Sequence, residues 1–133
     1  MKAKISYEEI TTYVKEHYKV SPELKRIDDK TIEAAYMPAK FLPAISIQIK
    51  VEEVKEDILC IVYESSSTTS LIIEKAIEQV GDRIPHGIEV SAKDKRITLY
   101  LSQIEQTKKI MEHIRLENMY INEDSLELAV GLR

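Results

Sequence analysis

The chain has 133 residues, of which 44% are apolar and 32% are charged, a size and balance typical of one globular domain. Nineteen Lys and Arg against 23 Asp and Glu give a net charge of -4, and the two signs are interspersed rather than blocked. This distribution argues against the basic face of a nucleic-acid-binding protein. The 3 glycines leave little material for phosphate-binding loops. We therefore expect a single soluble domain spanning residues 1–133.

The number of cysteines and the lengths of the apolar runs indicate where in the cell the protein can function. The single cysteine, Cys60, excludes an internal disulfide and is compatible with a reducing environment. The first ten residues do not contain the apolar stretch of a signal peptide. The longest apolar run, Ile58 to Tyr63, is far shorter than the roughly 20 residues that span a bilayer. We expect a cytoplasmic protein without a transmembrane segment, although a leader removed earlier would leave the same chain.

The first predicted element is a helix that begins after Ser6. Ser6 and Glu9 have the spacing of a capping box, in which side chain and backbone satisfy each other's amides. The helix should end near Val20, because Pro22 disfavours helical geometry in the residue before it. Its side chains at helical spacing form one amphipathic stripe: Ile10, Tyr13, Val14, His17 and Tyr18.

After this helix the apolar period changes from 3.6 to 2, which indicates strands. We predict four hairpins, which join Leu24–Ile27 to Thr31–Met37, Ile45–Val51 to Ile58–Glu64, Ile88–Val90 to Ile97–Leu101, and Glu117–Ile121 to Leu126–Leu132. The charged segment Glu52–Asp57 is expected to form the turn of the second hairpin.

Two further helices are predicted between the hairpins. The first covers roughly Leu71 to Val80 and ends at Gly81. The second starts at a capping box formed by Ser102 and Glu105 and carries its apolar side chains, Ile110, Met111 and Ile114, on one face. The resulting order, α-ββ-ββ-α-ββ-α-ββ, predicts an α+β fold: a curved antiparallel sheet with the N-terminal helix and two further helices packed on one face.

Catalytic and metal-binding patterns are weak. Ser65, Ser66, Ser67 and Ser70 precede His86, but no glycine-flanked nucleophile turn accompanies them, and helix capping explains the hydroxyls. The three histidines, His17, His86 and His113, do not have metal-ligand spacing. Cys60 lies inside a strand, where a small thiol packs as a hydrophobe. We therefore predict a non-enzymatic domain and assign no cofactor, metal or catalytic residue.

The order of elements resembles a known family. The segments LPAISIQIKVEEVKEDILCIVYES, SLIIEKAIEQVGDRIPHGIEVSAKDKRITLYLSQI and IRLENMYINEDSLELAV follow one another as the elements do in small tubular lipid-binding domains, the relatives of bactericidal permeability-increasing protein. The resemblance implies a helix in the groove of a curved antiparallel sheet, with an apolar space between them that accepts acyl chains. It also implies a carrier rather than an enzyme.

Two functions remain open. The first is binding of a hydrophobic or lipid-like ligand between helix and sheet, since a ligand site needs a pocket of about 300 Å³ or more. The residues expected to line it are Ile10, Val14, Tyr18, Ile47, Ile49 and Val62. The alternative is a structural or protein-interaction module, such as a homodimer, with no small-molecule ligand. A hydrolase that uses the serines and His86 is a third, weaker hypothesis.

Overall fold

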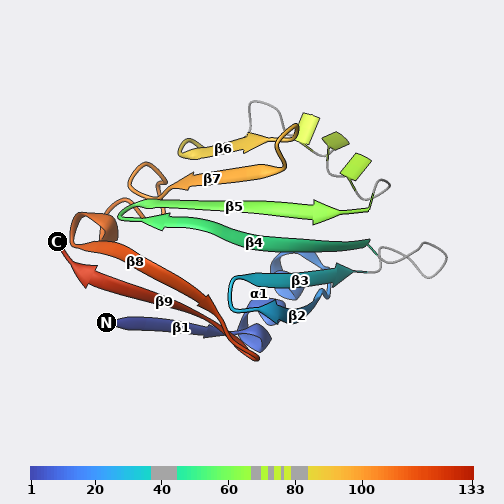
Figure 1. Ribbon diagram of the computed structural model, residues 1–133, viewed down its shortest axis with the longest axis horizontal. Coiled ribbons are helices and arrows are strands. Elements are labelled where there is room, and N and C mark those ends of the chain that lie inside the picture. Colours follow the sequence, from blue (N-terminus) through green and yellow to red (C-terminus); the bar gives the residue numbers. More distant parts are fainter. Residues whose placement is uncertain (37–44, 67–69, 72–73, 76, 79–83) are drawn as a thin grey trace.

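We describe residues 1–36, 45–66, 70–71, 74–75, 77–78 and 84–133 of a computed structural model (Figure 1). The named elements within these residues are nine strands, one α-helix and a short 3-10 helix, and a few positions between 70 and 78 are also helical. The elements are β1 (Lys2–Ser6), α1 (Tyr7–Tyr18), β2 (Glu23–Asp28), β3 (Thr31–Tyr36), β4 (Ile45–Lys55), β5 (Ile58–Ser65), β6 (Ile88–Ser91), β7 (Arg96–Tyr100), η2 (Ile110–Glu112), β8 (Ile114–Ile121) and β9 (Ser125–Leu132).

The strands form two antiparallel sheets. The large sheet has the order β2-β3-β4-β5-β7-β6, and the small sheet has the order β1-β9-β8. Every strand pair is antiparallel, as the short predicted turns require. The predicted α+β class with three helices on one sheet is wrong, because the described part of the chain is mostly β structure divided between two sheets.

The two sheets join along one side of β4. The strand β3 pairs with the first half of β4, and β8 lies beside its second half (Figure 1). The contact is a backbone bridge between Glu56 and Leu116, in which Leu116 N donates to Glu56 O at 2.6 Å. The strand β4 pairs with β5 as far as Lys55, well into the segment predicted as a charged turn, and Glu56 follows directly. This extra length carries the β4–β5 turn to the small sheet.

The apolar faces of the sheets meet in the core. Strand register places Ile32, Ile49 and Tyr63 on one face of the large sheet, which we call the inner face. There Ile32 and Val51 pack with Ile121 of β8, while half-buried side chains from both sheets surround them. A second cluster is centred on Leu116, Val130 and Met111. The core thus fills the space between the inner face and the small sheet.

The predicted N-terminal helix is confirmed. Ser6 Oγ accepts from Glu9 N at 3.0 Å and Ser6 N donates to a Glu9 carboxylate oxygen at 3.4 Å, which completes the capping box. The helix ends at Lys19, whose backbone is left-handed with φ 61°. Its main contacts are with β1 and with β2, the edge strand of the large sheet.

The predicted third helix is wrong. Residues 101–109 form turns, and only η2 is helical there. The expected cap, Ser102, donates its hydroxyl to a carboxylate oxygen of Asp57 instead, while Leu101 N donates to Asp57 O at 2.8 Å. These bonds tie the segment to the β4–β5 turn, and tertiary contacts of this kind override helix propensity. The apolar side chains that were expected on one helix face therefore lie in different environments, because Met111 is buried whereas Ile110 is exposed.

The other predictions have mixed outcomes. All four hairpins are present, with β8 three residues longer at its start than expected, from Ile114 instead of Glu117. The predicted second helix, 71–80, falls largely on residues outside the described ranges; positions 71, 74, 75, 77 and 78 are helical. The strand β1 was not predicted, because its alternation of Lys2, Ala3, Lys4 and Ile5 directly precedes a strong helix start.

Candidate functional site

The six predicted ligand-lining residues do not form one pocket wall. Ile47 and Ile49 lie on the inner face, but Val62 pairs with Lys50 and therefore points to the opposite side of the large sheet. Ile10 and Val14 are half-buried on α1. The strands that α1 contacts most are β1 and β2. The side chain of Tyr18 lies outside what the structure describes.

The described residues line two open surface depressions. One, of about 530 Å³, lies along α1 and is lined by Ser6, Glu8, Glu9, Thr12, Tyr13 and Glu16. The other, of about 520 Å³, lies over β6 and β7 and is lined by Glu89, Val90, Ser91, Arg96 and Thr98. Most of the residues that line them are of polar or charged type, and neither depression includes a predicted lining residue.

The serine and histidine candidates are not brought together. Ser65 Oγ and Ser70 Oγ lie 2.8 Å apart and bond to each other, and Ser70 N donates to Ser66 O at 2.8 Å. Ser67 falls outside the described residues. His86 is exposed in the turn before β6, whereas Ser65 is the last residue of β5. This arrangement resembles a hydroxyl-rich helix start more than a catalytic pair.

The remaining reactive side chains have ordinary structural partners. Cys60 is buried in β5, where its sulfur accepts from Thr98 Oγ1 at 3.8 Å. His17 stacks on Tyr13 with ring centroids 4.0 Å apart, and its Nδ1 lies 2.9 Å from Tyr13 O. Among the described residues no three His, Cys, Asp or Glu side chains are placed to hold a metal ion.

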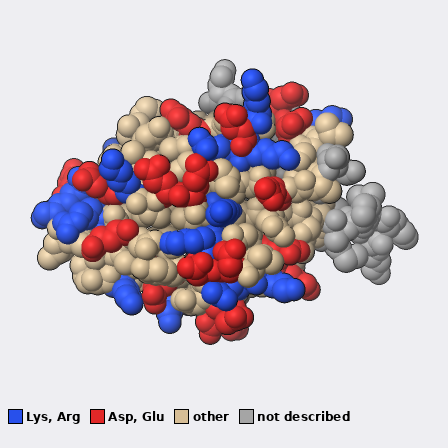
Figure 2. Space-filling view, viewed as in Figure 1, with Lys and Arg blue, Asp and Glu red and all other residues tan. Residues whose placement is uncertain are grey.

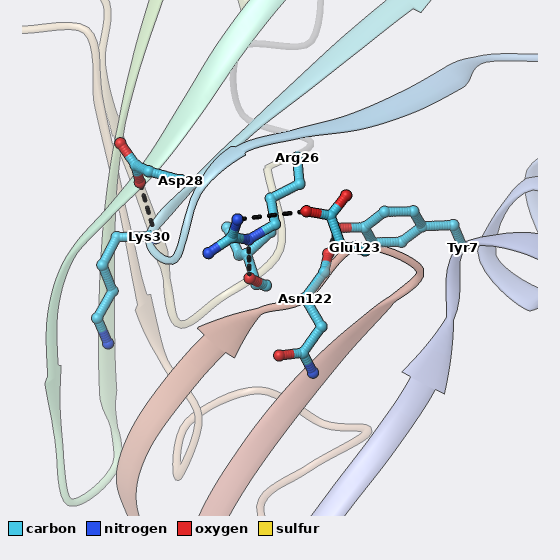
Figure 3. A network of polar contacts seen from close by, with 7 residues as sticks. Tyr7, Arg26, Asp28, Lys30, Asn122 and Glu123 are labelled. Atoms are coloured by element: carbon cyan, nitrogen blue, oxygen red, sulfur yellow. Dashed lines mark hydrogen bonds and ion pairs between the residues drawn. The ribbon is translucent and has the colours of Figure 1, made fainter.

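The densest polar cluster lies at the β8–β9 turn, and we call it the turn junction (Figure 3). Arg26 of β2 donates through Nε to Ile121 O at 2.8 Å and approaches the Glu123 carboxylate at 3.5 Å. Tyr7, the first residue of α1, donates its hydroxyl to Asn122 O at 2.5 Å. The β2–β3 hairpin and α1 are thereby both attached to one turn of the small sheet.

Lys30 forms the second half of the turn junction. Its ammonium donates to Met119 O at 2.7 Å and to the side-chain oxygen of Asn118, and it lies 4.9 Å from the centre of the Tyr120 ring. An ammonium group with two oxygen acceptors and an aromatic face is held more strongly than an exposed lysine. Backbone bonding adds to this contact, because Ile121 N donates to Asp29 O at 2.9 Å.

Two pKa shifts reflect this packing. Burial raises the pKa of the Tyr7 hydroxyl, and the nearby Arg26 guanidinium partly opposes the rise. The hydrogen bond from the Lys30 backbone amide lowers the pKa of the Asp28 carboxyl, since it stabilises the ionised form. The side-chain donors of Arg26, Lys30 and Tyr7 each bond to another element, so the chemistry of the turn junction is that of a structural joint.

The strand β1 is an edge of the small sheet, where it pairs with β9 alone among the described strands (Figure 1). Met1 N donates to Val130 O at 3.1 Å, and Val130 N donates to Met1 O at 2.8 Å. In an antiparallel ladder bonded residues alternate, so the backbone N–H and C=O of Lys2 and Lys4 point away from β9. We call this row of outward backbone groups the open edge.

One side of β1 is apolar and remains exposed. Met1, Ala3 and Ile5 continue the apolar face of the small sheet outward from β9. Burial declines along this face, since Val130 of β9 is buried whereas Ile5 and Met1 are 43% and 72% exposed. An apolar sheet face that ends uncovered at an unpaired edge is a template for another strand. The alternation of Lys with apolar residues in β1 was a signal for it in the sequence.

Comparisons with known proteins give no family assignment: no protein-family model, no curated protein and no solved structure matches this chain. The resemblance to tubular lipid-binding domains therefore stays a prediction. Within the described residues, no helix has the length and apolar character needed to cross a bilayer. Lys, Arg, Asp and Glu are interspersed over the face shown in Figure 2, without one large basic area.

Proposed function

We propose that this protein is a non-enzymatic interaction module that binds an extended segment of a partner protein along the open edge of β1. The observation that carries the proposal is the coincidence of unpaired backbone and uncovered apolar side chains on one strand. Backbone bonds from the edge would supply affinity, and the apolar positions Ala3 and Ile5 would supply contact area. We also propose a cytoplasmic location, supported by the unpaired Cys60.

The other sheet edges suit this role less well. The strand β6 has only four residues, and its first amide, Ile88 N, already donates to Pro85 O at 3.2 Å. The strand β2 lies against α1, which restricts access along it. Short or covered edges are common ways in which proteins avoid edge pairing. By contrast, Lys2, Ala3, Lys4 and Ile5 of β1 are all exposed.

Hydrogen exchange of the edge amides tests the proposal. A short synthetic peptide that alternates Thr and Val serves as an uncharged strand probe for the whole chain. We expect the Lys4 amide to exchange rapidly in the free protein and to become protected when the peptide binds. Lys4→Pro removes this amide without removing a bond to β9, because proline is tolerated where the N–H faces solvent. Unchanged exchange of Lys4 at saturating peptide contradicts the proposal.

A second function, binding of a hydrophobic ligand, is favoured by the inner face. Several aliphatic side chains on it are only half-buried, among them Ile47, Ile49 and Leu99. The resemblance to lipid carriers points in the same direction. Native mass spectrometry of the purified chain tests this alternative, and recovery of an apolar molecule bound in a one-to-one ratio supports it. A chain that carries nothing, even after incubation with a long-chain fatty acid, contradicts it.

A further inference from the structure

We propose that the open edge of β1 selects acidic strands and rejects a second copy of itself. This inference rests on the proposed function, because it names the partner chemistry of the same edge. The selective groups are Lys2 and Lys4, which lie on the side of the strand opposite Ala3 and Ile5. The matching partner is an extended segment in which Asp or Glu alternates with aliphatic residues.

The intramolecular neighbour shows how β1 is matched by such a strand. The strand β9 places Glu127 opposite Lys4, and Glu127 also forms an ion pair with Lys2 at 3.8 Å. On the apolar side Leu126 lies opposite Ile5. One carboxylate therefore faces two lysines, and one positive charge is left in excess along this side of β1. A second strand with acids at the corresponding positions would complete the pairing.

Self-pairing is disfavoured by the same side chains. Two copies of β1 that pair antiparallel must keep their apolar sides together to continue one sheet face. The two registers that pair most of the strand, centred on Ala3 or on Lys4, then set Lys2 opposite Lys4 or Lys4 opposite Lys4. Like charges directly opposite each other destabilise a strand pair, and lysines on edge strands prevent aggregation for this reason. The open edge can therefore pair with strands of other proteins, whereas its lysines disfavour pairing with β1 of a second copy.

Binding of charged strand probes tests the selection. We compare short labelled peptides that alternate Glu with Val, Thr with Val, or Lys with Val, and measure their affinity for the whole chain by fluorescence anisotropy. The Glu peptide should bind about tenfold more tightly than the Lys peptide, since this corresponds to the sum of two exchanged cross-strand pairs. The preference should shrink at high salt, because these charges are exposed. The double substitution K2E/K4E should reverse it.

The controls separate charge from backbone pairing. Lys4→Ala keeps the outward amide and should weaken the preference only, whereas Lys4→Pro should remove binding of all three peptides. Equal affinity for the three peptides overturns the selection but leaves strand addition standing. If none of them binds, both proposals fail. Sedimentation that shows dimers of the wild-type chain, but not of Lys4→Pro, overturns the rejection of a second copy.

Discussion

The turn junction and the open edge belong to the same small sheet, and they differ in what their polar groups do. At the turn junction, Arg26, Lys30 and Tyr7 direct their donors to carbonyl groups of β8 and the β8–β9 turn. At the open edge, Lys2 and Lys4 direct their backbone groups to solvent. A sheet that is anchored at one end can leave an edge free without losing its position, so the part that stabilises the sheet is separate from the edge at which we propose binding.

The largest expected effect is the loss of stability when a buried isoleucine is truncated, compared with truncation of an exposed isoleucine. Ile121 is 2% exposed where β8 enters the turn junction, and Ile5 on β1 is 43% exposed. Ile121→Ala should lower the free energy of unfolding by about 3 kcal/mol, because it removes core contacts and leaves a cavity. Ile5→Ala should cost less than about 1 kcal/mol. Urea denaturation of both variants measures this difference, and equal losses would mean that the edge is not open.

The next effect concerns the ammonium group of the turn junction. Lys30→Met keeps the length of the side chain but removes its bonds to Asn118 and Met119, and should cost about 2 kcal/mol. Lys25→Met is the matched control, because Lys25 is exposed on the neighbouring strand β2. That substitution should change stability by less than about 0.5 kcal/mol. Thermal or urea unfolding compares them, and an undiminished stability of Lys30→Met would show that Lys30 does not join the sheets.

Tyr7 adds a smaller contribution that depends on pH. Tyr7→Phe removes the hydroxyl bond to Asn122 O and should cost about 1 kcal/mol at neutral pH. Burial raises the pKa of Tyr7 in the folded chain, so its contribution is complete below about pH 10 and is lost as pH rises through the folded pKa. The difference between wild type and variant should therefore disappear at alkaline pH.

Unfolding curves between about pH 7 and pH 11 measure this convergence. Tyr13→Phe is the control, because the Tyr13 side chain is exposed on α1. A stability difference for Tyr7→Phe that stays constant across this range would contradict the role of the hydroxyl.

The sequence predicted local features better than their assembly. The capping box of α1 and the four hairpins depend on neighbouring residues, and the structure confirms them. The third helix failed because Ser102 bonds to Asp57, which is 45 residues away in the chain. Division of the strands into two sheets likewise depends on contacts such as that between Glu56 and Leu116. Local patterns do not contain these distant partners.

Prediction of the candidate surfaces is limited in the same way, because they too depend on contacts between distant parts of the chain. A pocket between α1 and β4 requires both elements to face each other, and the sequence could not show which strands α1 contacts. The register of β5 also decides that Val62 lies on the opposite face from Ile49. The open edge was within reach of sequence reasoning, since Lys2, Ala3, Lys4 and Ile5 alternate with period 2. Its status as an edge, however, depends on pairing with β9 at the far end of the chain.

The smallest expected effect lies at the β2–β3 turn. The Asp28 carboxylate accepts from Lys30 N at 2.9 Å, and this bond lowers its pKa in the folded chain. A lowered folded-state pKa gives stability that is present above the unfolded value, near pH 4, and is lost as pH falls through the folded value. Asp28→Asn should therefore reduce the loss of stability on acidification, while Asp94→Asn in the β6–β7 turn serves as the control. Because Asp28 is exposed, added salt should weaken the electrostatic part of the effect. Urea midpoints at about pH 6 and pH 3 measure it, and an identical acid-induced shift in wild type and Asp28→Asn would show that the turn bond does not couple to folding.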